Sequence, residues 1–219
     1  MQKTIEIPAA LRQTSLQLPA ILSDAEMRWL GDHNESLTIE QTADGLLIMT
    51  LATGSRGNRG EIRLVTELTN WNDRVQFGEI RGVSGGLLLP QGGQYQADAF
   101  VIAADDWAKV PMDHVDDLYP TAWPTAAFEL LSPTNLTATG YSKEFTKKLA
   151  DYEASAIAVV VLLHLKKRQA TIKRPGREAS LSQEKILTFP ELPGLELNAG
   201  LIYADSLRRF AFEPWPDGA

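Results

Sequence analysis

The run AIAVVVLLHL at residues 156–165 constrains the fold more than any other segment. Its aliphatic and β-branched residues continue without a polar interruption until His164, so a strand built from it is apolar on both faces. Such a strand needs cover on both sides of its sheet. We therefore predict an α/β (α+β) fold in which this segment lies within a mixed central sheet flanked by at least two helices.

The rest of the chain supplies the partners of this strand. Residues 37–50 read as two strand-like runs separated by Ala43-Asp44-Gly45, which is the turn chemistry of a hairpin. After the Gly-rich loop at 53–60, helical spacing continues to about Arg74, and we predict Asn58 as the N-cap. Further strands are expected within 77–90, 95–103, 126–131 and 170–176, and a second helix over 142–155.

Composition indicates one folded domain. The 219 residues are 44% hydrophobic and 22% charged, which is enough apolar material for a core. We expect an N-terminal arm (1–36) with one short helix around Asp24–Leu30, a single domain (37–210) and a short tail (211–219). The chain has no cysteine, which excludes disulfides, thiolate zinc sites and cysteine nucleophiles. No segment approaches the roughly 20 apolar residues of a membrane span, so we expect a soluble cytoplasmic protein.

Charge is unevenly distributed along the chain. The net charge of −7 argues against a protein that coats nucleic acid through bulk electrostatics. Residues 141–178 nevertheless carry nine Lys and Arg against four Asp and Glu, so this segment is +5 and the remainder is −12. A solvated helix face together with a charged turn at KKRQ (166–169) explains this pattern as well as a functional basic segment does.

Two carboxylates interrupt apolar, strand-like segments. Asp98 lies within YQADAFVI and Glu129 within AAFELL. A carboxylate desolvated without a partner costs several kcal/mol, so each must be paired, hydrogen-bonded, placed at a strand end or bound to a cation. Taken singly, each is more simply a surface or strand-end acid. Their occurrence on neighbouring predicted strands suggests that they converge.

The helix predicted over 142–155 points one lysine towards the sheet. Apolar residues recur at i, i+4, i+7 and i+11, at Phe145, Leu149, Tyr152 and Ala156. Lys148 lies beside this stripe, whereas Lys147 falls on the opposite, solvated side. The Lys148 ammonium can therefore reach the carboxylates. A structural ion pair with Glu129 and a catalytic role remain equally open at this point.

Together these residues resemble the motifs of a known protein family. Asp98, the segment FELLSPTN around Glu129, and KKLADYEASAI with Lys148 resemble the Uma-type endonuclease family of the restriction-endonuclease-like PD-(D/E)XK nuclease superfamily. Other segments are similar to the family's hairpin, Gly-rich loop, first helix, closing strand and tail, namely 39–62, 173–176 and 192–197. The resemblance spans about residues 37–203.

The resemblance implies a restriction-endonuclease-like fold with an N-terminal β-hairpin, and an endonuclease that hydrolyses DNA phosphodiester bonds. It implies Mg²⁺ (or Mn²⁺) held by Asp98, Glu129 and the backbone carbonyl of Leu130. Lys148 would position or deprotonate the nucleophile, or stabilise charge in the transition state. Glu61 is a candidate fourth acid, although an ordinary acid at a helix N-terminus is the simpler account. Glu40 stands where the family carries a hairpin glutamate, without an assigned role.

Partners follow from the same resemblance. DNA is the expected ligand, with Arg56, Asn58 and Arg59 as candidate phosphate contacts, and a homodimer is expected because paired sites cut both strands. A solvated loop is the simpler account of these three residues. The alternative function is a catalytically inactive nuclease-fold protein that binds nucleic acid or protein, with Asp98, Glu129 and Lys148 in a buried ionic network.

The sequence also departs from the family. Ala97 replaces the proline before the aspartate, Leu131 stands at the usual position of the superfamily's lysine, and His164 stands where relatives carry an aspartate. The lysine would therefore have to come from the helix, at Lys148. His33, His114 and His164 have no zinc-site spacing, so we assign them no function.

Overall fold

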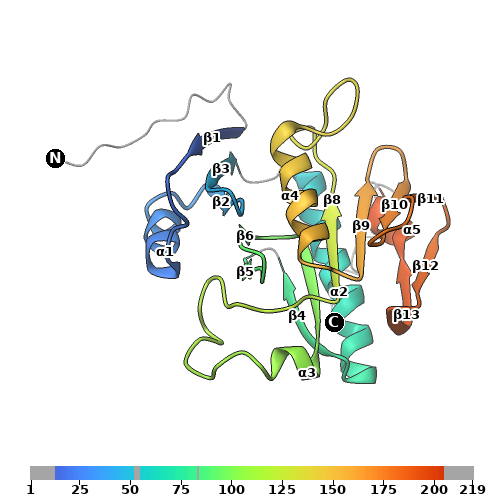
Figure 1. Cartoon of the computed structure of the whole chain (residues 1–219). Coiled ribbons are helices and arrows are strands. Elements are labelled where there is room, and N and C mark those ends of the chain that lie inside the picture. The colour runs from blue at the N-terminus through green and yellow to red at the C-terminus, as the bar shows by residue number, and fades with distance from the viewer. Residues whose placement is uncertain (1–12, 52–54, 83, 205–219) are drawn as a thin grey trace, which may run out of the picture.

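The computed structural model of the chain describes residues 13–51, 55–82 and 84–204, except for the side chains of Ser55 and Arg56 (Figure 1). The predictions for the beginning of the arm, the end of the domain and the tail (211–219) lie outside these ranges. The described helices are α1 (Asp24–Asp32), α2 (Ser55–Val75), α3 (Ala104–Trp107), α4 (Lys143–Ala154) and α5 (Ala199–Tyr203). None of them is long and apolar enough to cross a membrane.

A six-stranded mixed sheet forms the centre of the domain, with the strand order β11-β10-β9-β8-β7-β4. Its strands are β4 (Gly78–Gly82), β7 (Ala99–Ala103), β8 (Ala126–Leu130), β9 (Val159–His164), β10 (Gln169–Lys173) and β11 (Ser180–Ser182). β8 and β9 run parallel and every other neighbouring pair is antiparallel. The apolar run of residues 156–165 thus supplies β9, an interior strand, as predicted.

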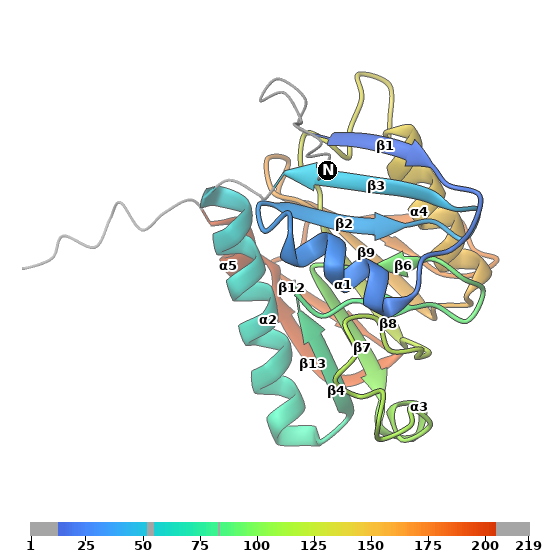
Figure 2. The ribbon, with the colours of Figure 1, turned by 90° about the vertical axis from the view of Figure 1, so that its left-hand side faces the viewer.

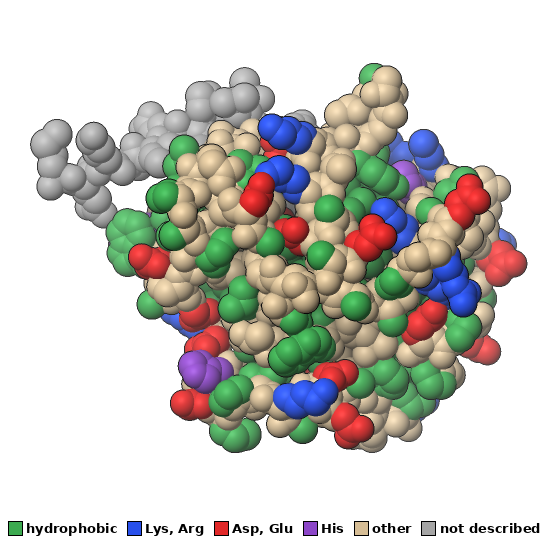
Figure 3. All heavy atoms as spheres, viewed as in Figure 1, with side chains coloured by type: hydrophobic (Ala, Val, Ile, Leu, Met, Phe, Trp, Pro, Cys, Tyr) green, Lys and Arg blue, Asp and Glu red, His purple; other side chains and the backbone are tan. Residues whose placement is uncertain are grey.

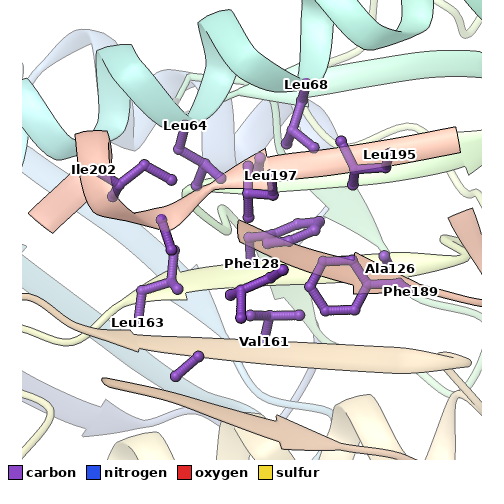
Figure 4. Close-up of a cluster of buried hydrophobic side chains, with 14 of the residues drawn as sticks. Leu64, Leu68, Ala126, Phe128, Val161, Leu163, Phe189, Leu195, Leu197 and Ile202 are labelled. Atoms are coloured by element: carbon purple, nitrogen blue, oxygen red, sulfur yellow. The ribbon is translucent and has the colours of Figure 1, made fainter. Parts of the chain in front are cut away.

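Both faces of the central sheet are covered, which explains why β9 is apolar on both sides. On one face, α2, α5 and the hairpin of β12 (Ile186–Phe189) and β13 (Leu192–Asn198) pack on alternate residues of β8 and β9 (Figure 4). Phe128 and Phe189 meet edge to face there, with ring centroids 5.9 Å apart. The other face is covered by α4 through Phe145, Leu149 and Tyr152.

A second sheet stands beside the first, with the order β1-β3-β2-β6-β5. It contains β1 (Gln13–Gln17), β2 (Leu37–Gln41), β3 (Leu46–Leu51), β5 (Leu87–Leu88) and β6 (Gln94–Tyr95). Figure 2 shows β1, β3 and β2 side by side with α1 against them. The predicted hairpin is therefore β2–β3, and Gly45 adopts the positive φ of +87° that its turn requires.

Three local expectations differ from the structure. Residues 13–17 were expected within an arm, but they pair with β3 as edge strand β1, which needs no apolar pattern because its residues remain half-buried or exposed. α2 begins at Ser55, so Asn58 lies inside the helix and does not cap it. Asp98 precedes β7 and does not interrupt it.

One edge of the central sheet collects the segments that carry the candidate site residues. The parallel strands β8 and β9 both end at this edge, which is uppermost in Figure 1. β7 begins there because it runs antiparallel to β8, and the connection from β8 leads at that edge into the start of α4. Residues 98, 129 and 130 therefore lie at the same end of the sheet.

Candidate active site

The register of β7 and β8 places Asp98 and Glu129 together. Ala99 pairs with Phe128, so continuing the antiparallel register by one residue sets Asp98 opposite Glu129. The Leu130 N–H donates a hydrogen bond of 2.5 Å to Oδ2 of Asp98. Glu129 shares the sheet face of Ala127, which packs on the α4 side. The two carboxylates, for which the sequence suggests convergence, are therefore neighbours.

Lys148 reaches this pair from α4, as the helical spacing predicted. Its side chain is buried, and its Nζ lies 2.8 Å from Oε1 of Glu129. The same ammonium donates to Oε1 of Glu40 at 2.7 Å and to the carbonyl oxygen of Gln96 at 3.4 Å. Lys147, expected to be fully solvated, instead forms an ion pair with Asp44 in the β2–β3 turn.

Glu40 is the site residue that sequence reasoning left without a role. It lies on β2 in the second sheet, is 9% exposed, and accepts hydrogen bonds from Lys148 and from the Gln96 N–H at 2.9 Å. The sequence does show an acid within the strand-like run LTIEQ. A buried acid needs a cation or hydrogen-bond donors, so this position could have indicated a paired Glu40. Glu40 therefore ties the second sheet to α4.

Tyr152 completes the surroundings of Glu129. Its hydroxyl donates to Oε1 of Glu129 at 2.7 Å, and it lies one helical turn after Lys148. The Lys148 Nζ also lies 5.6 Å from the ring centroid of Tyr95 and 5.7 Å from that of Tyr152, within cation–π range. Two rings and two carboxylates hold the ammonium in one position.

The pKa shifts favour the charged form of Lys148 and disfavour the charged forms of Asp98 and Glu129. Burial lowers the pKa of Lys148, but the charges of Glu129 and Glu40 outweigh it, so the pKa lies above its ordinary value of 10.5. Burial raises the pKa of Asp98 well above its ordinary value, and the charge of Glu129 raises it further. Burial also raises the pKa of Glu129, although Lys148 opposes this.

Glu61 lies close enough to the pair to act on it. It is buried at 4% exposure, and its charge contributes to the raised pKa of Asp98. Because α2 begins at Ser55, Glu61 lies beyond the first turn, and the simpler account of it as a helix N-terminal acid is wrong. Asn58 is exposed and Arg59 half-buried on the preceding turn. The side chain of Arg56 is outside the described set.

The donor chemistry around Asp98 and Glu129 fits a hard divalent cation. The hydrogen bonds use Oδ2 of Asp98 and Oε1 of Glu129, which leaves one oxygen of each carboxylate without a hydrogen bond among the described residues. Mg²⁺ is usually bound by one or two carboxylates and keeps several waters. No group of three or more His, Asp or Glu within the described ranges is arranged to hold a metal, so a cation here would rely on waters and the Leu130 carbonyl.

Comparison with known proteins identifies the family and the fold. A family model described as "Uma2: Putative restriction endonuclease" matches residues 25–200. The chain belongs to the Uma2 family. A solved structure described as a "putative nuclease belonging to DUF820" from Anabaena variabilis matches with a TM-score of 0.60 at 12% identity, covering 76% of this chain and 89% of that one. That likeness shows the fold, and it confirms the predicted nuclease-like architecture. None of the curated proteins matches the chain.

The departure at Leu131 has a structural reason in this Uma2 chain. Leu131 is buried in the α4-side core, where a lysine would have to displace apolar packing. The ammonium reaches Glu129 from Lys148 on the neighbouring helix. His164, at the end of β9, is half-buried and lies 3.5 Å from the Thr171 hydroxyl through Nε2.

Proposed function

We propose that this Uma2 chain is a Mg²⁺-dependent endonuclease that hydrolyses phosphodiester bonds of DNA. The observation that carries the proposal is the position of Lys148. A buried ammonium touches Glu129 at 2.8 Å, and Glu129 lies opposite Asp98 in the β7–β8 register. Acid, acid and lysine on two strand ends and one helix are the parts that phosphoryl hydrolysis needs at one place.

Each residue has a defined role in this proposal. Asp98 and Glu129 would hold Mg²⁺ through their free oxygens, with the Leu130 carbonyl as a further ligand and Glu61 acting through water. The bound Mg²⁺ would polarise the phosphate and lower the pKa of a water molecule. The charges of Glu129 and Glu40 raise the pKa of Lys148, which favours its protonated form. In its protonated form Lys148 would stabilise negative charge that develops on the phosphate.

The second candidate is an inactive nuclease-fold protein that binds nucleic acid or protein. The pairing of Lys148 with both Glu40 and Glu129 favours it, because such a network can serve stability alone. The two candidates differ in metal dependence. An active site needs the cation between Asp98 and Glu129, whereas a structural network is complete without it.

Incubation with supercoiled plasmid in Mg²⁺, Mn²⁺ or EDTA tests the proposal. Wild type should convert the plasmid in the metals and not in EDTA, and Glu129→Gln and Lys148→Met should lower the rate by at least about 100-fold, the scale of one lost electrostatic stabiliser. Asp44→Asn, which loses only the ion pair with Lys147, should retain activity. A linear product would support a homodimer that cuts both strands, and a nicked product would support single cuts. Equal rates for wild type and Glu129→Gln would refute the proposal.

A further inference from the structure

The turn between β9 and β10 carries a dense positive charge. Lys166, Lys167 and Arg168 follow one another, all three are exposed, and Arg168 adopts a φ of +50° within the turn. Figure 3 shows basic side chains gathered at the upper right, over the β9–β10 turn. Three consecutive cations stand out in a chain whose net charge is −7.

The topology places this turn at the same edge as the candidate active site. β8 and β9 are parallel neighbours, with Leu130 paired with Leu163, so the chain leaves both strands at one edge. The Leu131 N–H donates to the Leu163 carbonyl oxygen at 2.9 Å, which holds the two strand ends together. The turn begins only three residues after Leu163, and it therefore projects beyond the edge where Glu129 and Asp98 lie.

The beginning of α2 closes the same edge from the other layer. A Cβ added at Gly60 would lie 2.4 Å from Cδ2 of Leu130 and 3.5 Å from Leu165, so the helix backbone approaches both strand ends closely. Arg59 precedes this contact and Lys166 follows Leu165. The basic turn and the first turns of α2 therefore flank the end of β8.

The positive charge of the turn acts on its neighbour at the end of β9. Burial lowers the pKa of His164, and the charge of Lys167 lowers it further. The lysine is thus close enough to the strand end to affect a titrating group there. Its ammonium remains exposed and available to a ligand in solvent.

We infer that the β9–β10 turn, through Lys166 and Lys167, binds the phosphate backbone of duplex DNA beside the phosphate held at Asp98 and Glu129. This inference rests on the proposed function, since it takes that site as the point of cleavage. The turn follows β9, the direct neighbour of β8, so it contacts the backbone near the scissile phosphate.

The test measures the salt dependence of DNA binding in EDTA, where no metal-dependent cleavage occurs. The probe is a fluorescent 30-base-pair duplex of mixed sequence, and binding to the full chain is followed by anisotropy between about 50 and 200 mM KCl. The variant is Lys166→Gln/Lys167→Gln. Its matched control is Arg74→Gln/Arg177→Gln, which also removes two exposed cations, but at the far end of α2 and after the far end of β10.

Loss of two phosphate contacts should reduce the slope of log K against log salt by about 1.8. Between 50 and 200 mM KCl, the fold-loss of affinity should be about 12 times smaller for the turn variant than for wild type. At low salt the turn variant should bind DNA more weakly than wild type. The control should match wild type in slope. Thermal unfolding of both variants checks that the fold is intact, as substitutions of exposed turn residues should leave it.

Equal slopes for wild type and the turn variant, an equal loss in both variants, or no binding of duplex by wild type would each overturn the inference. Failure of the proposed function has a different signature. In that case binding and the change in slope persist, but the plasmid is not cut in either metal. If wild type cuts the plasmid in metal but the turn variant has the same salt slope as wild type, the proposed active site is supported and the role of the turn is refuted.

Discussion

The Nζ atom of Lys148 lies 2.7 Å from Oε1 of Glu40, although 108 residues separate the two along the chain. Glu40 belongs to the second sheet and Lys148 to the helix over the central sheet. The hairpin therefore does more than extend the fold, because its acid fixes the lysine that faces Glu129. Neighbouring Lys147 pairs in the same way with Asp44 of the hairpin turn, but near the surface.

Glu40→Gln should destabilise the protein substantially. Lys148 is buried and would keep Glu129 as its sole carboxylate partner, so we expect a loss of about 2–3 kcal/mol in the free energy of unfolding, below the full cost of an unpaired buried charge. Urea denaturation measures this change. Asp44→Asn breaks the more exposed ion pair between Lys147 and Asp44, and it should cost about 0–1 kcal/mol. Equal costs for the two variants would show that the Glu40 contact contributes no more than a surface pair.

Tyr152→Phe should remove one hydrogen bond while keeping the packing of the ring. The hydroxyl donates to the buried Oε1 of Glu129 at 2.7 Å, and a bond to a charged acceptor contributes about 1.5–3 kcal/mol. Tyr203→Phe is the matched control, because the buried Tyr203 hydroxyl has no hydrogen-bond partner among the described residues. That control should be neutral or stabilising in the same denaturation experiment. The reverse order of the two variants would contradict the hydrogen-bond assignment.

The contribution of Asp98 to the stability of the metal-free protein should fall as the pH rises above about 4. The pKa of Asp98 in the folded state is raised well above 3.8, so between the two values the folded state binds the extra proton. The free energy of unfolding contributed by this group is present at low pH and is lost as the pH rises through the raised pKa. Asp98→Asn keeps an acceptor for the Leu130 N–H and removes the titration. In EDTA between pH 5 and 8, the stability of wild type should therefore fall relative to that of Asp98→Asn, and a parallel pH dependence of the two proteins would argue against a raised pKa.

Sequence reasoning recovered the elements whose signal is local. The uninterrupted apolar run identified β9, and the helical spacing of Phe145, Leu149 and Tyr152 oriented α4 so that Lys148 faced the sheet. The Ala43-Asp44-Gly45 turn located the β2–β3 hairpin. In each case the residues that determine the element lie within one short segment, so the sequence pattern alone predicts it.

The missed features depend on contacts between distant segments. Strand β1 is an edge strand with polar, partly exposed residues, so only its pairing with β3 reveals it. The role of Glu40 requires knowledge that β2 packs beside α4. The residue type of Asn58 predicts an N-cap, whereas the helix begins earlier, at Ser55. The same extension places Glu61 past the first turn of the helix.

Calorimetric titration of Mn²⁺ into wild type, Asp98→Asn and Glu129→Gln at pH 7.5 tests the metal site most directly. Two carboxylates with free oxygens on adjacent strands should bind one ion in wild type, and each substitution should abolish or strongly weaken that binding. Asp44→Asn should bind as wild type does. If wild type binds no ion, or if both site variants bind as tightly as wild type, then Asp98, Glu129 and Lys148 form a structural network and the account of a metal-dependent nuclease is contradicted.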